Sequence, residues 1–189
     1  MQRMTRTLLL ALILLISSNT LSAQKIKQPK AYDTQIGAMV SMLEDLKTRI
    51  TQRVRLVNRE GTDFLLDENA NRIGAMILHL AAIEAYYQVY TFEDRSFNEE
   101  EMAKWGLALE LGEEAREKLV GKPITYYLNI WSDVRKETLR QLKTKDDQWF
   151  KAKTKLSNMD NHWAWFHVME HQANHMGQIA MIKKRIPKK

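Results

Sequence analysis

Residues 160–185, DNHWAWFHVMEHQANHMGQIAMIKKR, are the stretch that decides the fold. Asp160 is a favourable N-cap for a helix, and the basic residues at the other end suit the last turn of one. Pro187 follows this turn, and prolines are common just beyond helix ends. The stretch therefore predicts a long final helix that carries most of the histidines of the chain.

Three further segments carry apolar residues at spacings of three and four, which is the helical pattern. They cover about residues 33–58, 69–92 and 123–143. Residues 98–118 begin with a capping-box-like sequence but have only a weak apolar stripe. We therefore expect an all-α protein, an antiparallel four-helix bundle with a short helical excursion between the second and third principal helices.

The composition excludes several classes of site. The chain has 189 residues, enough for a single domain with a sizeable core, and it has no cysteine. The absence of cysteine excludes disulfide scaffolds, thiolate zinc sites, c-type haem attachment and cysteine nucleophiles. Histidines are then the strongest nitrogen ligands that remain, and there are five: His79, His162, His167, His171 and His175.

Residues 1–23 have the three-part layout of a secretory signal peptide. Arg3 and Arg6 precede an apolar run over residues 8–16, and small residues end the segment. The run is shorter than the roughly 20 residues that span a bilayer. We therefore expect an exported protein, periplasmic or secreted, whose single domain covers residues 24–189. A leader retained as an anchor is the alternative.

The net charge points to no charged partner. The formal charge is +6, but the leader and the basic tail after Ile182 supply the excess, so that the body of the protein is nearly neutral. Its basic residues are not interleaved with aromatic residues in a stripe. We therefore expect no nucleic-acid partner and, once the leader is removed, no stable membrane insertion.

The histidine spacing indicates a metal site. His171 and His175 are four residues apart, so both imidazoles can face one ion from the same helix. His167 is on the same stripe but is about 12 Å from His175 along the axis, too far for the same ion. A third ligand must come from elsewhere: His79, on the apolar face of another predicted helix, or a carboxylate. A histidine held in the core by hydrogen bonds is the alternative for His79, and His162 and His167 receive no role.

Several motifs of other metal and hydrolytic sites are missing from the sequence. It has no H-E-x-x-H motif, no paired Glu-x-x-His motifs of di-iron bundles, no glycine-rich phosphate loop and no nucleophile-elbow serine. Glu84 is a candidate proton acceptor, although it lies about 140° around the helix from His79. A helix-surface or structural carboxylate is the alternative interpretation of Glu84. Tyr86, Tyr87, Trp163 and Trp165 are candidates for lining an apolar pocket, or for plain core. Mononuclear binding by three histidines is the interpretation that remains.

Two segments resemble a known family. Residues 167–179, HVMEHQANHMGQI, resemble the terminal helix of the DinB/YfiT-like superfamily, which has an E-H-x-x-x-H-x-G-Q-I-type pattern. Residues 71–84, NRIGAMILHLAAIE, look like the second helix of that family, where a single histidine precedes a glutamate. The resemblance extends over about residues 32–187.

The resemblance implies a four-helix bundle with one divalent metal ion, most often zinc or nickel. His79, His171 and His175 would be the ligands, with one position open to water or substrate. Characterised members include thiol-dependent transferases and a thiol-dependent isomerase, and a homodimer is the oligomeric state that the family suggests.

Three hypotheses for function follow. The first is an exported metal-dependent enzyme that hydrolyses a small substrate or transfers a thiol. The second is a non-catalytic metal- or ligand-binding bundle, and the third is a structural protein with histidines in its core. Because ligand imidazoles must be neutral, metal occupancy is expected to fall below about pH 6.

Overall fold

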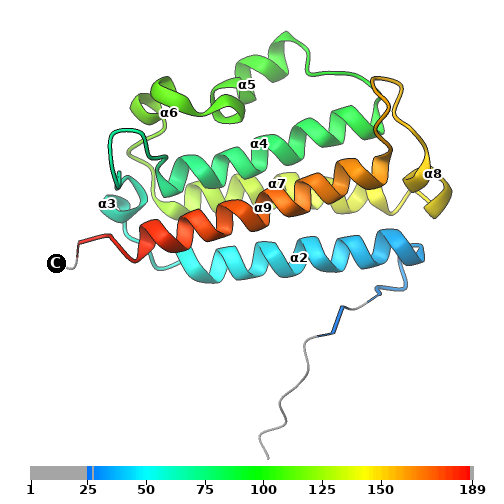
Figure 1. The fold of residues 1–189 in the computed structure, drawn as a ribbon, viewed down its shortest axis with the longest axis horizontal. Helices are drawn as coiled ribbons and strands as arrows, with labels where there is room; N and C mark the ends of the chain where they lie inside the picture. Colours follow the sequence, from blue (N-terminus) through cyan, green and yellow to red (C-terminus); the bar gives the residue numbers. More distant parts are fainter. Residues whose placement is uncertain (1–24, 27, 188–189) are drawn as a thin grey trace, which may run out of the picture.

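The computed structural model describes residues 25, 26 and 28–187, and this part of the chain is helical with no strand (Figure 1). The all-α prediction is confirmed. The helices are α2 (Thr34–Val54), α3 (Arg59–Thr62), α4 (Ile73–Phe92), α5 (Glu99–Glu110), α6 (Gly112–Lys118), α7 (Ile124–Leu142), α8 (Asp147–Lys151) and α9 (Asn161–Lys183).

Local sequence signals set where these helices begin. The Asp160 side chain accepts a hydrogen bond from the backbone N–H of Trp163, as expected of the N-cap of α9. Asn98 and Glu101 form the complete capping box at the start of α5. Both caps match the sequence prediction, while α4 begins four residues later than expected, at Ile73.

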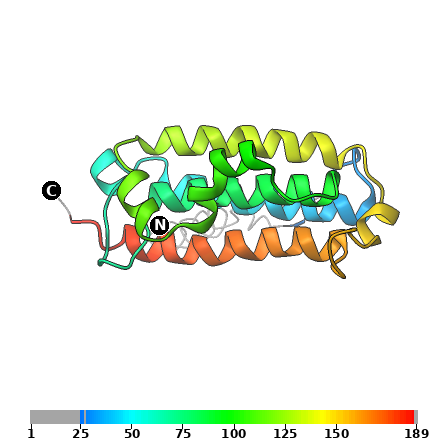
Figure 2. The ribbon, with the colours of Figure 1, turned by 90° about the horizontal axis from the view of Figure 1, so that it is seen from above.

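Four long helices, α2, α4, α7 and α9, lie side by side around a shared apolar core (Figures 1 and 2). The largest fully buried side chains include Trp131 and Tyr127 of α7 and Trp165 of α9. Helix α4 packs against both α7 and α9, and nearly its whole circumference is apolar or buried. A helix of that kind needs neighbours on several sides, which is why α4 is covered by α5 as well.

The prediction that all four long helices are antiparallel in chain order is wrong for α4 and α7. Gly74 near the start of α4 faces Tyr127 near the start of α7, and Gln88 near the end of α4 donates a hydrogen bond to Thr138 near the end of α7. The two helices therefore run in the same direction. The physical reason is the predicted excursion, because α5 and α6 run back along the outside of α4 before α7 begins (Figure 1).

The predicted leader, residues 1–23, lies outside the described residues, so the cleavage site and export stay predictions. No helix of the part that the structure describes is both long and apolar enough to cross a membrane.

Candidate metal site

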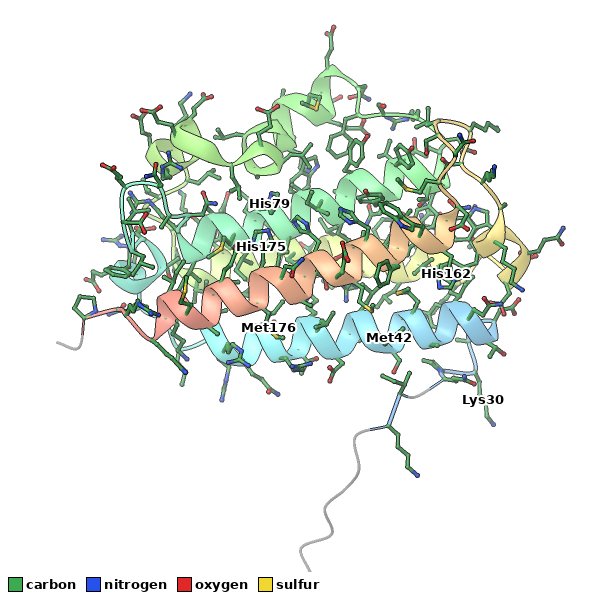
Figure 3. The ribbon with its side chains drawn as sticks, viewed as in Figure 1. Lys30, Met42, His79, His162, His175 and Met176 are labelled. Atoms are coloured by element: carbon green, nitrogen blue, oxygen red, sulfur yellow. The ribbon has the colours of Figure 1, made fainter. Side chains whose placement is uncertain are left out.

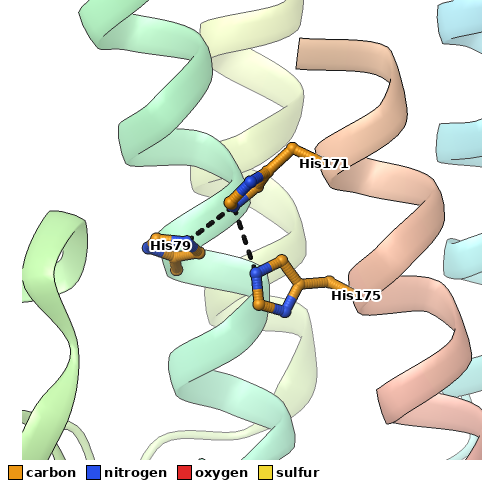
Figure 4. A group of neighbouring side chains, drawn as sticks. All are labelled: His79, His171 and His175. Atoms are coloured by element: carbon orange, nitrogen blue, oxygen red, sulfur yellow. Dashed lines mark hydrogen bonds between the residues drawn. The ribbon is translucent and has the colours of Figure 1, made fainter. Parts of the chain in front are cut away.

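His79 from α4 and His171 and His175 from α9 come together between these two helices (Figure 4), and Figure 3 shows where His79 and His175 lie along them. The Nε2 atom of His171 lies 2.7 Å from Nε2 of His79 and 3.1 Å from Nε2 of His175. One potential ligand atom from each ring lies within 4.8 Å of the others. The structure thus assembles the three residues that the sequence singled out, although His79 and His171 are 92 residues apart in the chain.

The orientation of the His79 ring is set by helix α5, the first helix of the excursion. Its Nδ1 lies 2.8 Å from the backbone carbonyl oxygen of Ala108 in α5. A carbonyl oxygen can only accept, so Nδ1 must carry the hydrogen, and the Nε2 lone pair of the neutral ring is left facing the other two histidines. Such a second hydrogen bond is the usual support of a metal-binding imidazole. No sequence signal predicts this contact, because the acceptor is a main-chain atom.

All three imidazoles are held in the neutral form. Burial and the neighbouring histidines lower the pKa of His171 to about 3, and burial together with His79 lowers the pKa of His175 to about 4. Burial also lowers the pKa of His79, although its hydrogen bond to Ala108 opposes this effect. Protons therefore compete for these nitrogens only at a lower pH than the value near 6 expected from ordinary imidazoles.

The donor set fits a divalent ion. Three neutral imidazoles are characteristic ligands of a catalytic zinc site, where metal–nitrogen bonds of about 2.0 Å hold the nitrogens about 3.3 Å apart. The two observed nitrogen–nitrogen distances, 2.7 and 3.1 Å, are a few tenths of an ångström shorter. The Nε2 atom of His175 faces Nε2 of His171, so Nε2 is the ligand atom that this ring presents to the cluster. The three-histidine cluster could therefore hold a divalent metal ion.

Glu84 is not placed as a proton acceptor for this site. Its carboxylate is fully buried and accepts hydrogen bonds from Arg135, Trp131 and Thr138 of α7. Burial alone would raise the pKa of Glu84, but the Arg135 guanidinium and these hydrogen bonds hold it below the usual value. Of the two interpretations of Glu84, the structure favours a structural carboxylate.

The buried network around Glu84 reaches the metal-site helix through Gln172. The Gln172 amide donates to Glu84 and accepts from Arg135, both at 3.3 Å. Because Gln172 directly follows His171, these bonds fix the rotation of α9 at the candidate site. Sequence reasoning missed both Arg135 and Gln172. Arg135 stands in no recognisable motif, and Gln172 occupies a variable position between the two histidines of the quoted pattern.

The two unassigned histidines lie outside the cluster. His162 is exposed and stacks on Phe150, with 4.5 Å between ring centroids. His167 pairs its Nδ1 with the Glu170 carboxylate at 3.1 Å, and its ring lies 5.7 Å from that of His171. His167 is thus a neighbour of the site, as the spacing along the helix predicted.

The four aromatic residues considered for a pocket divide into two groups. Trp165 is completely buried and packs on Phe92, so it is plain core. Tyr86 and Tyr87 of α4 and Trp163 of α9 are only partly covered and lie in a chain of ring contacts that passes through His167.

A separate cavity of about 780 Å³ lies between α4, α5 and α7. Phe92, Phe97 and Trp105 contribute apolar surface to it, and Glu100 and Asp133 contribute acidic groups. In the part of the chain that the structure describes, none of the three clustered histidines lines this cavity.

The helices and the cluster define a class: an all-α protein with a potential three-histidine metal site shared by two long helices. A family model described as mycothiol-S-transferase matches residues 38–187, and the chain therefore belongs to this family, which is DinB/YfiT-like. The resemblance found in the sequence is confirmed. A comparison with curated proteins gave no significant match.

Proposed function

We propose that this protein is a metal-dependent thiol S-transferase whose metal ligands are His79, His171 and His175. The observation that carries the proposal is the convergence of three neutral Nε2 atoms from α4 and α9. The four long helices act as a four-helix bundle scaffold, and zinc or nickel is the expected ion. The family match supports S-transfer, with a low-molecular-weight thiol as one substrate.

When bound, a divalent ion would supply Lewis acidity that lowers the pKa of a thiol at its open position. The residues of the chain perform the other tasks. The Ala108 carbonyl fixes the ring of His79, and the Gln172 hydrogen bonds fix the rotation of α9. Burial of His79 and His175 keeps water from most of the cluster, which strengthens electrostatic interactions there.

A metal analysis combined with an activity assay tests this proposal. We expect the purified protein to bind about one divalent ion per chain and, when loaded, to accelerate conjugation of a small thiol to an alkylating agent. His171→Ala should lose both properties. The matched control is His162→Ala, which removes an exposed histidine of the same helix and should retain both.

The other functions considered from the sequence give different results. Stoichiometric metal without thiol consumption would favour the non-catalytic bundle, and hydrolysis of an ester without thiol consumption would favour the hydrolase. Full retention of metal in His171→Ala would contradict the ligand assignment itself.

A further inference from the structure

Three rings lead away from the candidate metal site along α9 and α4. The centroid of the His167 ring lies 5.7 Å from His171, 5.3 Å from Trp163 and 5.7 Å from Tyr87. His167 and Trp163 precede His171 by four and eight residues, so they share one face of α9. We call Tyr87, His167 and Trp163 the ring row.

The orientation of the ring row is fixed before any ligand arrives. The planes of Trp163 and His167 differ by only 4°, and the Glu170 carboxylate holds His167 through its Nδ1. Tyr87 in turn packs against Tyr86, with 5.6 Å between ring centroids. A surface fixed in this way binds a ligand with little further loss of side-chain freedom.

The ring row is also accessible. Trp163 is 48% exposed, which leaves a large apolar ring surface uncovered. Among the clustered histidines, His79 and His175 are 7% and 9% exposed, whereas His171 is only half-buried. The cluster is therefore most open at His171, and the ring row begins there.

We propose that the ring row is a subsite for a planar, unsaturated group of the electrophilic substrate, an inference that rests on the S-transfer function proposed above. Aromatic faces and edges favour a flat ring over a saturated ring of similar size. An electrophile stacked on the row carries its reactive carbon towards His171. With an acrylamide, the thiol sulfur bonds to the terminal carbon, the electron pair of the C=C bond moves to the adjacent carbon, and that carbon takes the thiol proton.

A pair of non-reactive amides isolates ring recognition from turnover. N-phenylpropanamide and N-cyclohexylpropanamide share the same amide and carry a six-membered ring that is flat and aromatic in the first and puckered and saturated in the second. Their affinities for the zinc-loaded protein can be measured by ligand-observed NMR. We expect the phenyl compound to bind about three- to tenfold more tightly. It should also shift the indole N–H resonance of Trp163.

Variants of two exposed aromatic residues complete the experiment. Trp163→Leu keeps an apolar side chain without a flat face, so the two compounds should bind this variant with about equal affinity. Trp163→Phe should restore part of the preference for the phenyl compound. Phe166, 41% exposed and outside these ring contacts, is the matched control: Phe166→Leu should keep the full preference.

Equal affinities in the wild type, or an undiminished preference in Trp163→Leu, would overturn the subsite. S-transfer is measured separately on the same zinc-loaded samples. Loss of transfer with the ring preference intact would overturn the proposed function and not the recognition of flat rings.

Discussion

The guanidinium of Arg135 in α7 donates two hydrogen bonds to the carboxylate of Glu84 in α4, at 2.6 and 2.9 Å. Glu84 is 0% exposed and Arg135 is 3% exposed, so this is a buried ion pair. Trp131 donates a further bond to Glu84 at 3.0 Å and Thr138 one at 2.7 Å, which nearly saturates the carboxylate. Through Gln172 the same pair is tied to the helix that carries two of the three clustered histidines.

Replacing Arg135 by leucine should destabilise the protein strongly. The substitution leaves the Glu84 carboxylate buried without its counter-ion, and breaking such a pair costs about 3–5 kcal/mol. Urea denaturation at pH 7 measures the free energy of unfolding.

Arg140→Leu is the matched control on the same helix. Arg140 pairs with Glu137 at the surface, where water screens an ion pair and leaves it little effect on stability. Similar losses of stability in the two variants would contradict the importance of the buried pair.

The sequence predicts the local features of this protein better than its long-range contacts, for physical reasons. Local signals act over a few residues, and they placed the caps at Asn98 and Asp160 and the face shared by His171 and His175 correctly. The Glu84–Arg135 pair joins residues 51 apart and depends on α4 and α7 being parallel, which no local pattern encodes. The direction of α7 follows from the path of the excursion, and that path is set by packing.

Gly74→Ala should destabilise the contact between α4 and α7. A Cβ atom at this position would lie 2.5 Å from Cε2 of Tyr127 and 2.9 Å from Cγ2 of Thr62, and Tyr127 is fully buried and has no room to move. Overpacking of this kind costs about 1–3 kcal/mol, of which the better helix propensity of alanine recovers up to about 1 kcal/mol.

Gly177→Ala is the matched control for this glycine. It also lies within a long helix, but among the described residues a Cβ there would meet no atom within 4 Å apart from its chain neighbours and the backbone of its own helix. The free energy of unfolding should therefore rise, by up to about 1 kcal/mol. A stabilising Gly74→Ala would show that α4 and α7 are less closely packed than the structure has them.

The metal-free protein should lose stability as the pH falls below about 6.5. The pKa values of His171 and His175 are lowered to about 3 and 4, so the unfolded chain takes up protons near pH 6.5 while the folded chain does not. The contribution of these two histidines to stability is then fully present above about pH 7. It is lost progressively as the pH falls towards the pKa values of the folded protein. Because the rings are partly open to water, we expect at most about 1 kcal/mol per histidine between pH 7.5 and 5.5.

Urea denaturation of wild type and His171→Gln at these two pH values measures this effect. The variant lacks one titrating group and should show a smaller decrease than the wild type. Titration of Glu84 does not interfere in this pH range, because its lowered pKa keeps the carboxylate ionised in the folded protein throughout. Equal decreases in both proteins would show that His171 does not carry the depressed pKa.

Metal binding should raise the thermal stability of the wild type and not of His175→Ala. An ion that binds only the folded state adds about 2.7 kcal/mol at a free concentration one hundred times its Kd. His175→Ala removes one of the three converging Nε2 atoms, so the remaining two histidines should bind the ion far more weakly. Differential scanning calorimetry with and without Zn²⁺ would measure the change in Tm, with His162→Ala as the control that keeps the wild-type increase. An increase in Tm of the same size in His175→Ala would place the ion at another site.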